Sequence, residues 1–359
     1  MTITTNKFCV CGDASSDILY KEVNIPAAHG FHMLPPSPWP LVGSISALTL
    51  VCGIVLYMHG YAFGGLTSIV GLCSLLITMV GWWGDIIRES LFLGFHTTKV
   101  QFGLRMGMVL FIVSEGMLFF SLFWGFLHSS LNPSIEIISW PPSGIITASP
   151  WGLPLVNTGL LVTSGATATW SHYLLLCGSL RYTLSSLCGT IALGSVFLAV
   201  QMFEYVESPF SISDGIFGSV FFLTTGFHGF HVFIGTIFLI VCGIRIYKQE
   251  LARDHHVGFE CALWYWHFVD VVWLFLFMLV YWWGAHKSIF FRNTIMPQVD
   301  FCVFFKSTLL TLFIFFSIFF FRALKLVTQI FILYILVLAL KEKILLPSVV
   351  SIFNVDFVA

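Results

Sequence analysis

Five ionisable side chains lie inside long apolar stretches of this sequence, where an uncharged residue would be the ordinary choice. A charge at the centre of a membrane helix costs about 3 kcal/mol, so polar residues retained there usually face the interior of a helix bundle. Such residues carry protons, bind ions or hold helices together by hydrogen bonds. The five are Glu115, His228, His231, His267 and Asp270.

Glu115 lies near the middle of one apolar stretch, MGMVLFIVSEGMLFFSLFWGF, with Ser114 beside it. Loss of water favours the protonated form of a carboxylic acid. One interpretation is a proton or ion relay, or a polar group that controls the protonation of a neighbour. The other is a neutral acid that joins two helices by hydrogen bonds, and the residues alone leave both open.

His228 and His231 are three residues apart in TTGFHGFHVFIG, so both lie on one face of a helix. His267 and Asp270 repeat this spacing in a second apolar stretch. Two imidazoles on one face can begin a metal or haem site, but such a site needs further ligands and an open coordination position. The alternative is a hydrogen-bond network between helices. Nothing in the sequence fixes which of these side chains converge.

A further group of polar residues adjoins the ends of the apolar stretches, mixed with tryptophan. Basic side chains at a membrane surface suit lipid phosphates, and tryptophan rings sit at the level of the headgroups. An equally good explanation is the ordinary positive charge that sets the orientation of a membrane protein. The candidates for lipid contacts are Trp82, Trp83, Arg88, His96, Arg105, Arg245 and Lys248.

Composition places these residues in an integral membrane protein. Charged residues make up 9% of the 359 residues and hydrophobic residues 58%, whereas a soluble domain has about 25% charged residues. The net charge is −1 and the basic residues are scattered, so no basic face exists that could follow a phosphate backbone. We therefore exclude nucleic acid as a partner.

Seven apolar runs before residue 285 reach the length of about 20 residues that a membrane-spanning helix needs. If all seven cross, every Lys and Arg before residue 254 falls on one side, and acidic residues such as Glu204 and Asp214 fall on the other. The positive-inside rule predicts this asymmetry. We therefore expect an all-α membrane protein with helices near 39–58, 61–83, 106–127, 153–177, 184–203, 216–244 and 261–284.

The two ends of the chain differ from this core. Residues 1–28 have no arginine and no continuous apolar stretch, unlike a transit peptide or a signal peptide, which favours synthesis inside an organelle. Residues 285–359 are rich in phenylalanine, and apolar runs at 301–321 and 326–340 leave one further helix, two, or an interfacial segment open. The expected division is an extension at 1–28, a core at 29–284 and a tail at 285–359.

Long motifs in the core resemble those of cytochrome c oxidase subunit III, in the form found in mitochondria. The likeness covers residues 29–284, and the motifs are specific because they are long and follow one another in a fixed order. They include HGFHMLPPSPWPL, WWGDIIRES, GFHTTKVQFGLR, LFIVSEGMLFF, HSSLNPSIEIISWPPSGI, FSISDGIFGSVFFLTTGFHGFHVFIGTIFLIVCGIR and HHVGFECALWYWHFVDVVWLFLF.

The resemblance implies seven helices, two followed by five, with phospholipids in a cleft between the two groups. It implies docking against catalytic subunit I, with subunit II and accessory subunits as further partners and cytochrome c contacted only indirectly. Haem and copper then belong to the partner subunits, and this chain has no catalytic residue and no metal ligand. His228, His231, His267 and Asp270 become a structural polar network.

The resemblance also assigns roles to single positions. Glu115 matches the family's intramembrane glutamate, which is associated with proton uptake. Arg88, His96 and Arg105 match positions near the lipid cleft, and Arg245 matches one near a bound phospholipid. The implied role is a non-redox core subunit of a proton-pumping terminal oxidase in the mitochondrial inner membrane, which stabilises the catalytic subunit, holds lipids and supports proton uptake.

Three features limit or compete with this interpretation. Gly84 replaces the arginine of a common WWRD motif. A quinol oxidase subunit of the same superfamily typically has five spans and lacks the first pair. A proton-coupled transporter would use Glu115, His228 and Asp270 as its ion site and would have an inverted internal repeat, which we do not find in the sequence.

Overall fold

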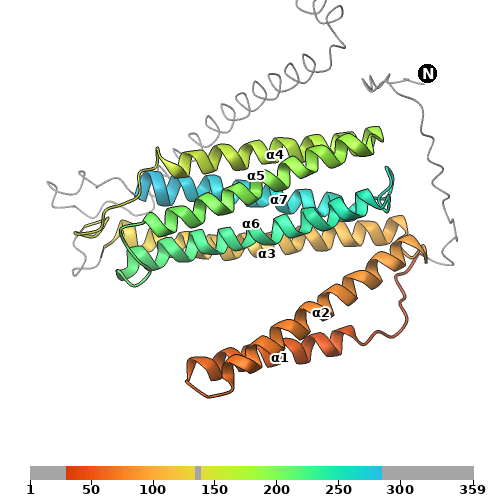
Figure 1. Cartoon of the computed structure of the whole chain (residues 1–359), viewed down its shortest axis with the longest axis horizontal. Coiled ribbons are helices and arrows are strands. Elements are labelled where there is room, and N and C mark those ends of the chain that lie inside the picture. The colour runs from red at the N-terminus through yellow and green to blue at the C-terminus, as the bar shows by residue number, and fades with distance from the viewer. Residues whose placement is uncertain (1–29, 134–138, 285–359) are drawn as a thin grey trace, which may run out of the picture. The chain divides into compact units, whose positions relative to one another are not determined.

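The computed structural model describes residues 30–133 and 139–284, which form helices and loops without a β-strand. The expected all-α class is confirmed, and the predictions for residues 1–28 and 285–359 lie outside the described residues. The helices, labelled in Figure 1, are α1 (Trp39–Met58), α2 (Gly64–Leu91), α3 (Thr98–Leu131), α4 (Leu153–Cys177), α5 (Leu180–Glu207), α6 (Gly215–Tyr247), α7 (Val257–Leu276) and the π-helix η1 (Phe277–Trp283), which continues α7.

Six helices in the described part of the chain are long and apolar enough to cross a membrane. They are α1, α2, α3, α5, α6 and α7 with η1. The shortest has 20 residues, which at 1.5 Å per residue gives about 30 Å, the thickness of the hydrocarbon core of a bilayer. The chain is therefore a multi-pass membrane protein.

The remaining helix, α4, has 25 residues but is less apolar than the other six. It contains Asn157 and several Ser and Thr residues, most of whose hydroxyl groups donate to a carbonyl three or four residues earlier in the same helix. Such bonds satisfy a hydroxyl group without any neighbouring helix. α4 packs against α5 and α7, so protein covers much of its polar surface.

Several helices extend beyond the apolar runs that predicted them. α3 begins at Thr98 rather than near 106, and α2 continues to Leu91 rather than ending near 83. Arg88 and Arg105 therefore lie on helical turns and not in loops. Long basic side chains can reach water from inside a helix because their methylene stems tolerate an apolar surface.

The chain divides into two compact units, one that ends at Phe111 and one that begins at Ile112. In the first unit, α1 packs along α2 (Figure 1). Gly71 lies against the backbone of Leu50, and a side-chain carbon at residue 71 would overlap that backbone. Gly53 lies in the same way against the backbone of Ser68. Glycine allows this close approach, which is a common way for helices to associate in lipid.

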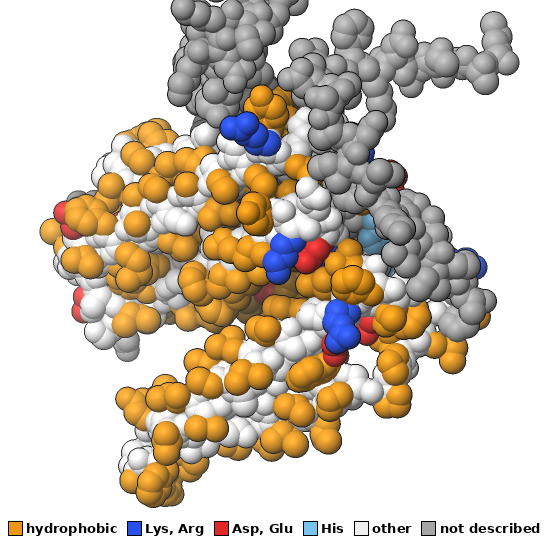
Figure 2. Space-filling view, turned by 45° about the vertical axis from the view of Figure 1, so that its right-hand side comes forward, with side chains coloured by type: hydrophobic (Ala, Val, Ile, Leu, Met, Phe, Trp, Pro, Cys, Tyr) orange, Lys and Arg blue, Asp and Glu red, His pale blue; other side chains and the backbone are white. Residues whose placement is uncertain are grey.

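The second unit has an interior of aromatic rings and hydrogen-bonded polar groups. Trp266 and Trp273 of α7 are fully buried. Their indole N–H groups donate to the hydroxyl groups of Ser164, at 3.0 Å, and Thr158, at 2.9 Å, on α4. The outside is different, because apolar side chains cover most of the face shown in Figure 2 and charged side chains are few.

Candidate functional site

Glu115 and His231 form a close pair inside the second unit. Oε2 of Glu115, on α3, lies 2.9 Å from Nε2 of His231, on α6. The His231 side chain is 7% exposed and the Glu115 side chain 24% exposed. The ring of Phe119 lies edge-on to the imidazole at 4.9 Å, and the ring of Tyr265 stacks at 6.2 Å. The carboxyl group and the imidazole thus meet beside aromatic rings, with the imidazole buried and the carboxyl group partly exposed.

The second ring nitrogen of His231 fixes where the proton of this pair can lie. Nδ1 is 2.7 Å from the carbonyl oxygen of Phe227, and a carbonyl only accepts, so Nδ1 carries a hydrogen. Nε2 therefore either accepts a hydrogen bond from a protonated Glu115 or donates one to its carboxylate. Both states use the same geometry and differ by the movement of one proton between Oε2 and Nε2.

His228 contacts a different helix from His231. Its Nε2 lies 3.2 Å from the carbonyl oxygen of Val269 on α7, to which it donates, and the rings of Phe197 and Trp273 pack edge-on or tilted against it. Its Nδ1 has no hydrogen-bond partner among the residues that the structure describes. The two histidines do not point at a common atom, so the geometry favours the interhelical alternative over a shared metal or haem.

His267 and Asp270 connect α7 to α4. Nδ1 of His267 is 3.6 Å from Oδ2 of Asp270, and its Nε2 is 3.2 Å from the hydroxyl group of Thr169 on α4. Asp270 is placed beside Gly165 of α4, where a side-chain carbon would overlap Oδ2. Glycine at 165 therefore provides the space that the aspartate occupies. These contacts agree with a structural polar network, which remains a prediction.

A second buried polar cluster was not predicted from the sequence. The Asn157 amide donates to Oε1 of Gln201 at 3.2 Å, and the Gln201 amide donates to the Tyr281 hydroxyl group at 3.3 Å. The carboxyl group of Glu204 is buried beside Gln201 and Tyr281. Tyr205 donates to the Thr225 hydroxyl group at 2.6 Å. The available signal is the spacing of three between Gln201 and Glu204, but the apolar run at 184–203 ends before Glu204 and so predicts a position outside the membrane for it.

The lipid candidates on α2 are accessible in the first unit. Trp82 and Trp83 are 41% and 57% exposed. The Arg88 side chain is 74% exposed and lies 3.9 Å from the carboxylate of Asp85. Asp85 also accepts a 2.6 Å hydrogen bond from the indole of Trp39, so it ties α1 to α2. Arg88 keeps most of its surface for another partner.

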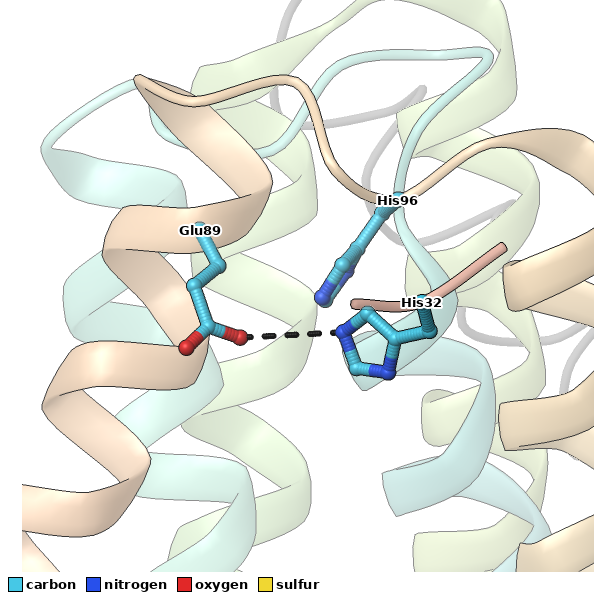
Figure 3. Close-up of side chains that lie close together, drawn as sticks. All are labelled: His32, Glu89 and His96. Carbon is cyan, nitrogen blue, oxygen red and sulfur yellow. Dashed lines mark ion pairs between the residues drawn. The ribbon is translucent and has the colours of Figure 1, made fainter. Parts of the chain in front are cut away.

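His96, in the loop after α2, points toward two other polar side chains, as Figure 3 shows. Nε2 of His32 lies 3.8 Å from Oε2 of Glu89, and the rings of His32 and His96 are edge to face at 5.6 Å. One nitrogen or oxygen atom from each of the three lies within 4.8 Å of the others. His96 therefore belongs to a small polar cluster at one end of α2.

The other lipid candidates differ in their accessibility. Arg105 is half-buried on α3. Arg245, near the end of α6, donates through Nε to Glu250 at 3.3 Å, and its side chain is 15% exposed. Lys248, the residue after α6, is exposed. Arg245 is thus largely occupied by an internal ion pair, whereas Lys248 is open to the surroundings.

The described core resembles known proteins along its whole length. The family model described as cytochrome c oxidase subunit III matches residues 29–285. A protein of Marchantia polymorpha named cytochrome c oxidase subunit 3 is 54% identical over 265 residues, which are 74% of this chain and 100% of the relative. Proteins of the same name from Triticum aestivum and Arabidopsis thaliana are each 54% identical over 258 residues, 72% of this chain and 97% of each relative.

Proposed function

The chain belongs to the cytochrome c oxidase subunit III family, and we propose that within this multi-subunit enzyme it is a non-redox core subunit that supports proton uptake. Its main contact is catalytic subunit I, with subunit II and accessory subunits beside it, and its location is the mitochondrial inner membrane. The contact between Glu115 and His231 is the observation that carries the proton role.

The pair suits a proton reservoir because it holds one proton in either of two positions without a change in total charge. The neutral acid with a neutral imidazole and the carboxylate with an imidazolium both sum to zero. Moving a net charge in a low-dielectric interior is expensive, so a group that rearranges its proton at constant charge avoids much of that cost. The partial exposure of Glu115 leaves a route for exchange with a neighbouring group.

The proposed absence of haem and copper from this chain is supported by the contacts of three histidines on α6 and α7. His228 donates to a backbone carbonyl, His231 contacts Phe227 and Glu115, and His267 contacts Thr169 and Asp270. These contacts use every ring nitrogen of the three histidines except Nδ1 of His228, which is buried without a partner among the described residues. Electron transfer is therefore assigned to partner subunits.

Lipid binding is the other part of the proposed role. Trp83 and Arg88 combine an exposed indole with an exposed guanidinium on one helix, a pairing that suits the headgroup region of a phospholipid. Lys248 offers a second exposed cation at the end of α6. Retained phospholipid would fill space between this subunit and its surroundings and so stabilise the complex.

The proton role is tested with Glu115→Gln in the assembled oxidase. A glutamine amide can still donate to Nε2 of His231, so the hydrogen bond survives while the exchangeable proton is removed. We expect normal assembly, slower proton uptake and loss of activity after fewer turnovers. Glu204→Gln is the matched control, because it removes another buried acid from the same unit. It should change neither proton uptake nor the survival of activity during turnover.

Two results would count against this proposal. Failure of Glu115→Gln to assemble would assign the pair to helix packing. Normal assembly with unchanged proton uptake and unchanged survival during turnover would remove the proton role. The transporter alternative gains no support from the geometry, because Glu115, His228 and Asp270 each contact a different partner.

A further inference from the structure

Three side chains that have no part in the proposed proton role meet where α4 ends and α7 begins. They are His172 of α4, His256 immediately before α7, and Glu260 in the first turn of α7. Nε2 of His172 lies 3.2 Å from Nε2 of His256, which lies 3.4 Å from Oε1 of Glu260. His256 is buried and the other two are partly buried. One ligand atom from each of the two imidazoles and the carboxylate therefore lies within 4.8 Å of the other two.

A backbone contact orients the central imidazole of this group. Nδ1 of His256 lies 3.1 Å from the carbonyl oxygen of Ala252. The carbonyl accepts, so Nδ1 carries the hydrogen and the neutral ring turns the lone pair of Nε2 toward His172 and Glu260. Metal-binding histidines usually have this arrangement, in which one nitrogen donates to the protein and the other binds the ion.

The short distances require a proton or a metal ion between these atoms. With a neutral His256, the lone pairs of its Nε2 and of Glu260 Oε1 face each other at 3.4 Å. A proton on Nε2, a proton on the Glu260 carboxyl group, or a metal ion relieves this. Ligand atoms of a tetrahedral zinc ion, about 2.0 to 2.1 Å from the metal, lie about 3.3 Å from one another. The observed 3.2 and 3.4 Å match that edge length.

We propose that His172, His256 and Glu260 bind one divalent transition-metal ion, with zinc as the best fit. Two neutral imidazoles and one carboxylate form a donor set typical of zinc, with the fourth position left to water. The ion would join the end of α4 to the start of α7 and neutralise the Glu260 carboxylate. This inference departs from the sequence-based prediction that the chain has no metal ligand, and it does not depend on the proposed proton role.

The direct test locates the metal in the intact complex. The oxidase that contains this chain is incubated with zinc chloride, desalted and crystallised, and diffraction data are collected on both sides of the zinc absorption edge. We expect a zinc-specific anomalous peak about 2 Å from Nε2 of His172 and of His256. Data of sufficient quality with no peak at this position overturn the proposal and leave a proton-bridged pair.

Metal analysis provides a second readout. Elemental analysis of the same desalted complex should show one zinc fewer per complex in His172→Gln and in His256→Gln. The control is His255→Gln, which changes the neighbouring histidine and should retain the full zinc content. Equal zinc in all four proteins contradicts the proposal. If the two ligand variants do not assemble, the anomalous peak in the unaltered complex decides.

Discussion

The two compact units of this chain hold their helices together by different means. In the first, α1 meets α2 through glycines such as Gly53 and Gly71, which let the backbones touch. In the second, α4 meets α7 through side chains, with Trp266 and Trp273 donating to hydroxyl groups and Asp270 filling the space at Gly165. One contact depends on the absence of side chains and the other on their chemistry.

This difference follows from the lack of a hydrophobic force between helices in lipid. Apolar side chains gain nothing by leaving lipid for another helix, so close packing and hydrogen bonds have to provide the attraction. A glycine contact fails abruptly, because backbone atoms cannot move aside. A side-chain contact fails by degrees, because a rotamer can change or a second hydrogen bond can form.

The two histidine and glutamate clusters differ in a related way. His32 and Glu89 of the first unit are 3.8 Å apart, whereas His256 and Glu260 of the second are 3.4 Å apart. The two histidine rings are 5.6 Å apart between centroids in the first cluster and 5.3 Å in the second, where His172 and His256 also form a 3.2 Å hydrogen bond. The same residue types are therefore loosely gathered in one unit and arranged at coordination distance in the other. We therefore propose a metal ion only for the cluster of His172, His256 and Glu260.

The largest effect is expected from Gly71→Leu, which places a side chain against the backbone of Leu50. Overpacking costs about 1 to 3 kcal/mol even where side chains can adjust, and here the obstacle is backbone. We expect α1 to separate from α2 and the complex to lose this subunit during purification. The measurement is the yield of assembled oxidase relative to Gly84→Leu, a control on the same helix where the added carbon meets open space.

A smaller effect is expected from Gly165→Val, where the obstacle is the carboxylate of Asp270. The cost should be about 1 to 3 kcal/mol, and Asp270→Ala in the same chain should recover part of it. The measurement is a double-mutant cycle on the thermal stability of the complex. Strictly additive effects would show that residues 165 and 270 do not interact and would weaken the contrast between the two units.

Trp273→Phe should reduce stability still less. It removes the 2.9 Å hydrogen bond to Thr158 but keeps an aromatic ring, and hydrogen bonds between membrane helices average about 0.6 kcal/mol, with a maximum of about 1.7. Comparison with Trp273→Phe in a Thr158→Val background isolates the bond. A loss of the same size in both backgrounds would assign the effect to packing instead.

The smallest effect on stability is expected from Arg88→Gln. Arg88 is 74% exposed and its distance to Asp85 is 3.9 Å, and exposed pairs of this kind contribute little. We expect unchanged thermal stability but less phospholipid retained per purified complex, measured by phosphorus analysis. Arg245→Gln should behave in the opposite way, losing more stability than lipid, because Arg245 is mostly buried in a pair with Glu250. Equal phospholipid in the Arg88 variant and in the unaltered complex would remove Arg88 from the lipid candidates.

The number and order of the core helices were predictable from the sequence, because each helix contains its own apolar run of about 20 residues. Helix ends were less accurate, since residues such as Thr98 and Arg105 are polar yet helical. α4 was counted as an apolar span although its hydroxyl groups set it apart. They are accommodated mainly by bonds within the helix, which hydropathy does not register.

The contacts between helices were not predictable in the same way. Glu115 and His231 are 116 residues apart, and nothing local indicates that their helices touch. The spacing of His228 and His231 correctly placed both on one side of α6, but residues three apart are still about 60° apart around the axis. On a helix with neighbours on several sides, that angle is enough to direct one histidine to α7 and the other to α3.

The glycine contact between α1 and α2 has a consequence for how the protein is made. The two helices are consecutive and joined only by residues 59–63, so each already has its partner when the second leaves the ribosome. Two of their close contacts, Gly64 on the backbone of Tyr57 and Gly53 on the backbone of Ser68, lie near that turn. The helical hairpin of α1 and α2 can therefore form during translation and insert into the bilayer as a packed pair. The contacts between α4 and α7 can form only after α7 has been synthesised.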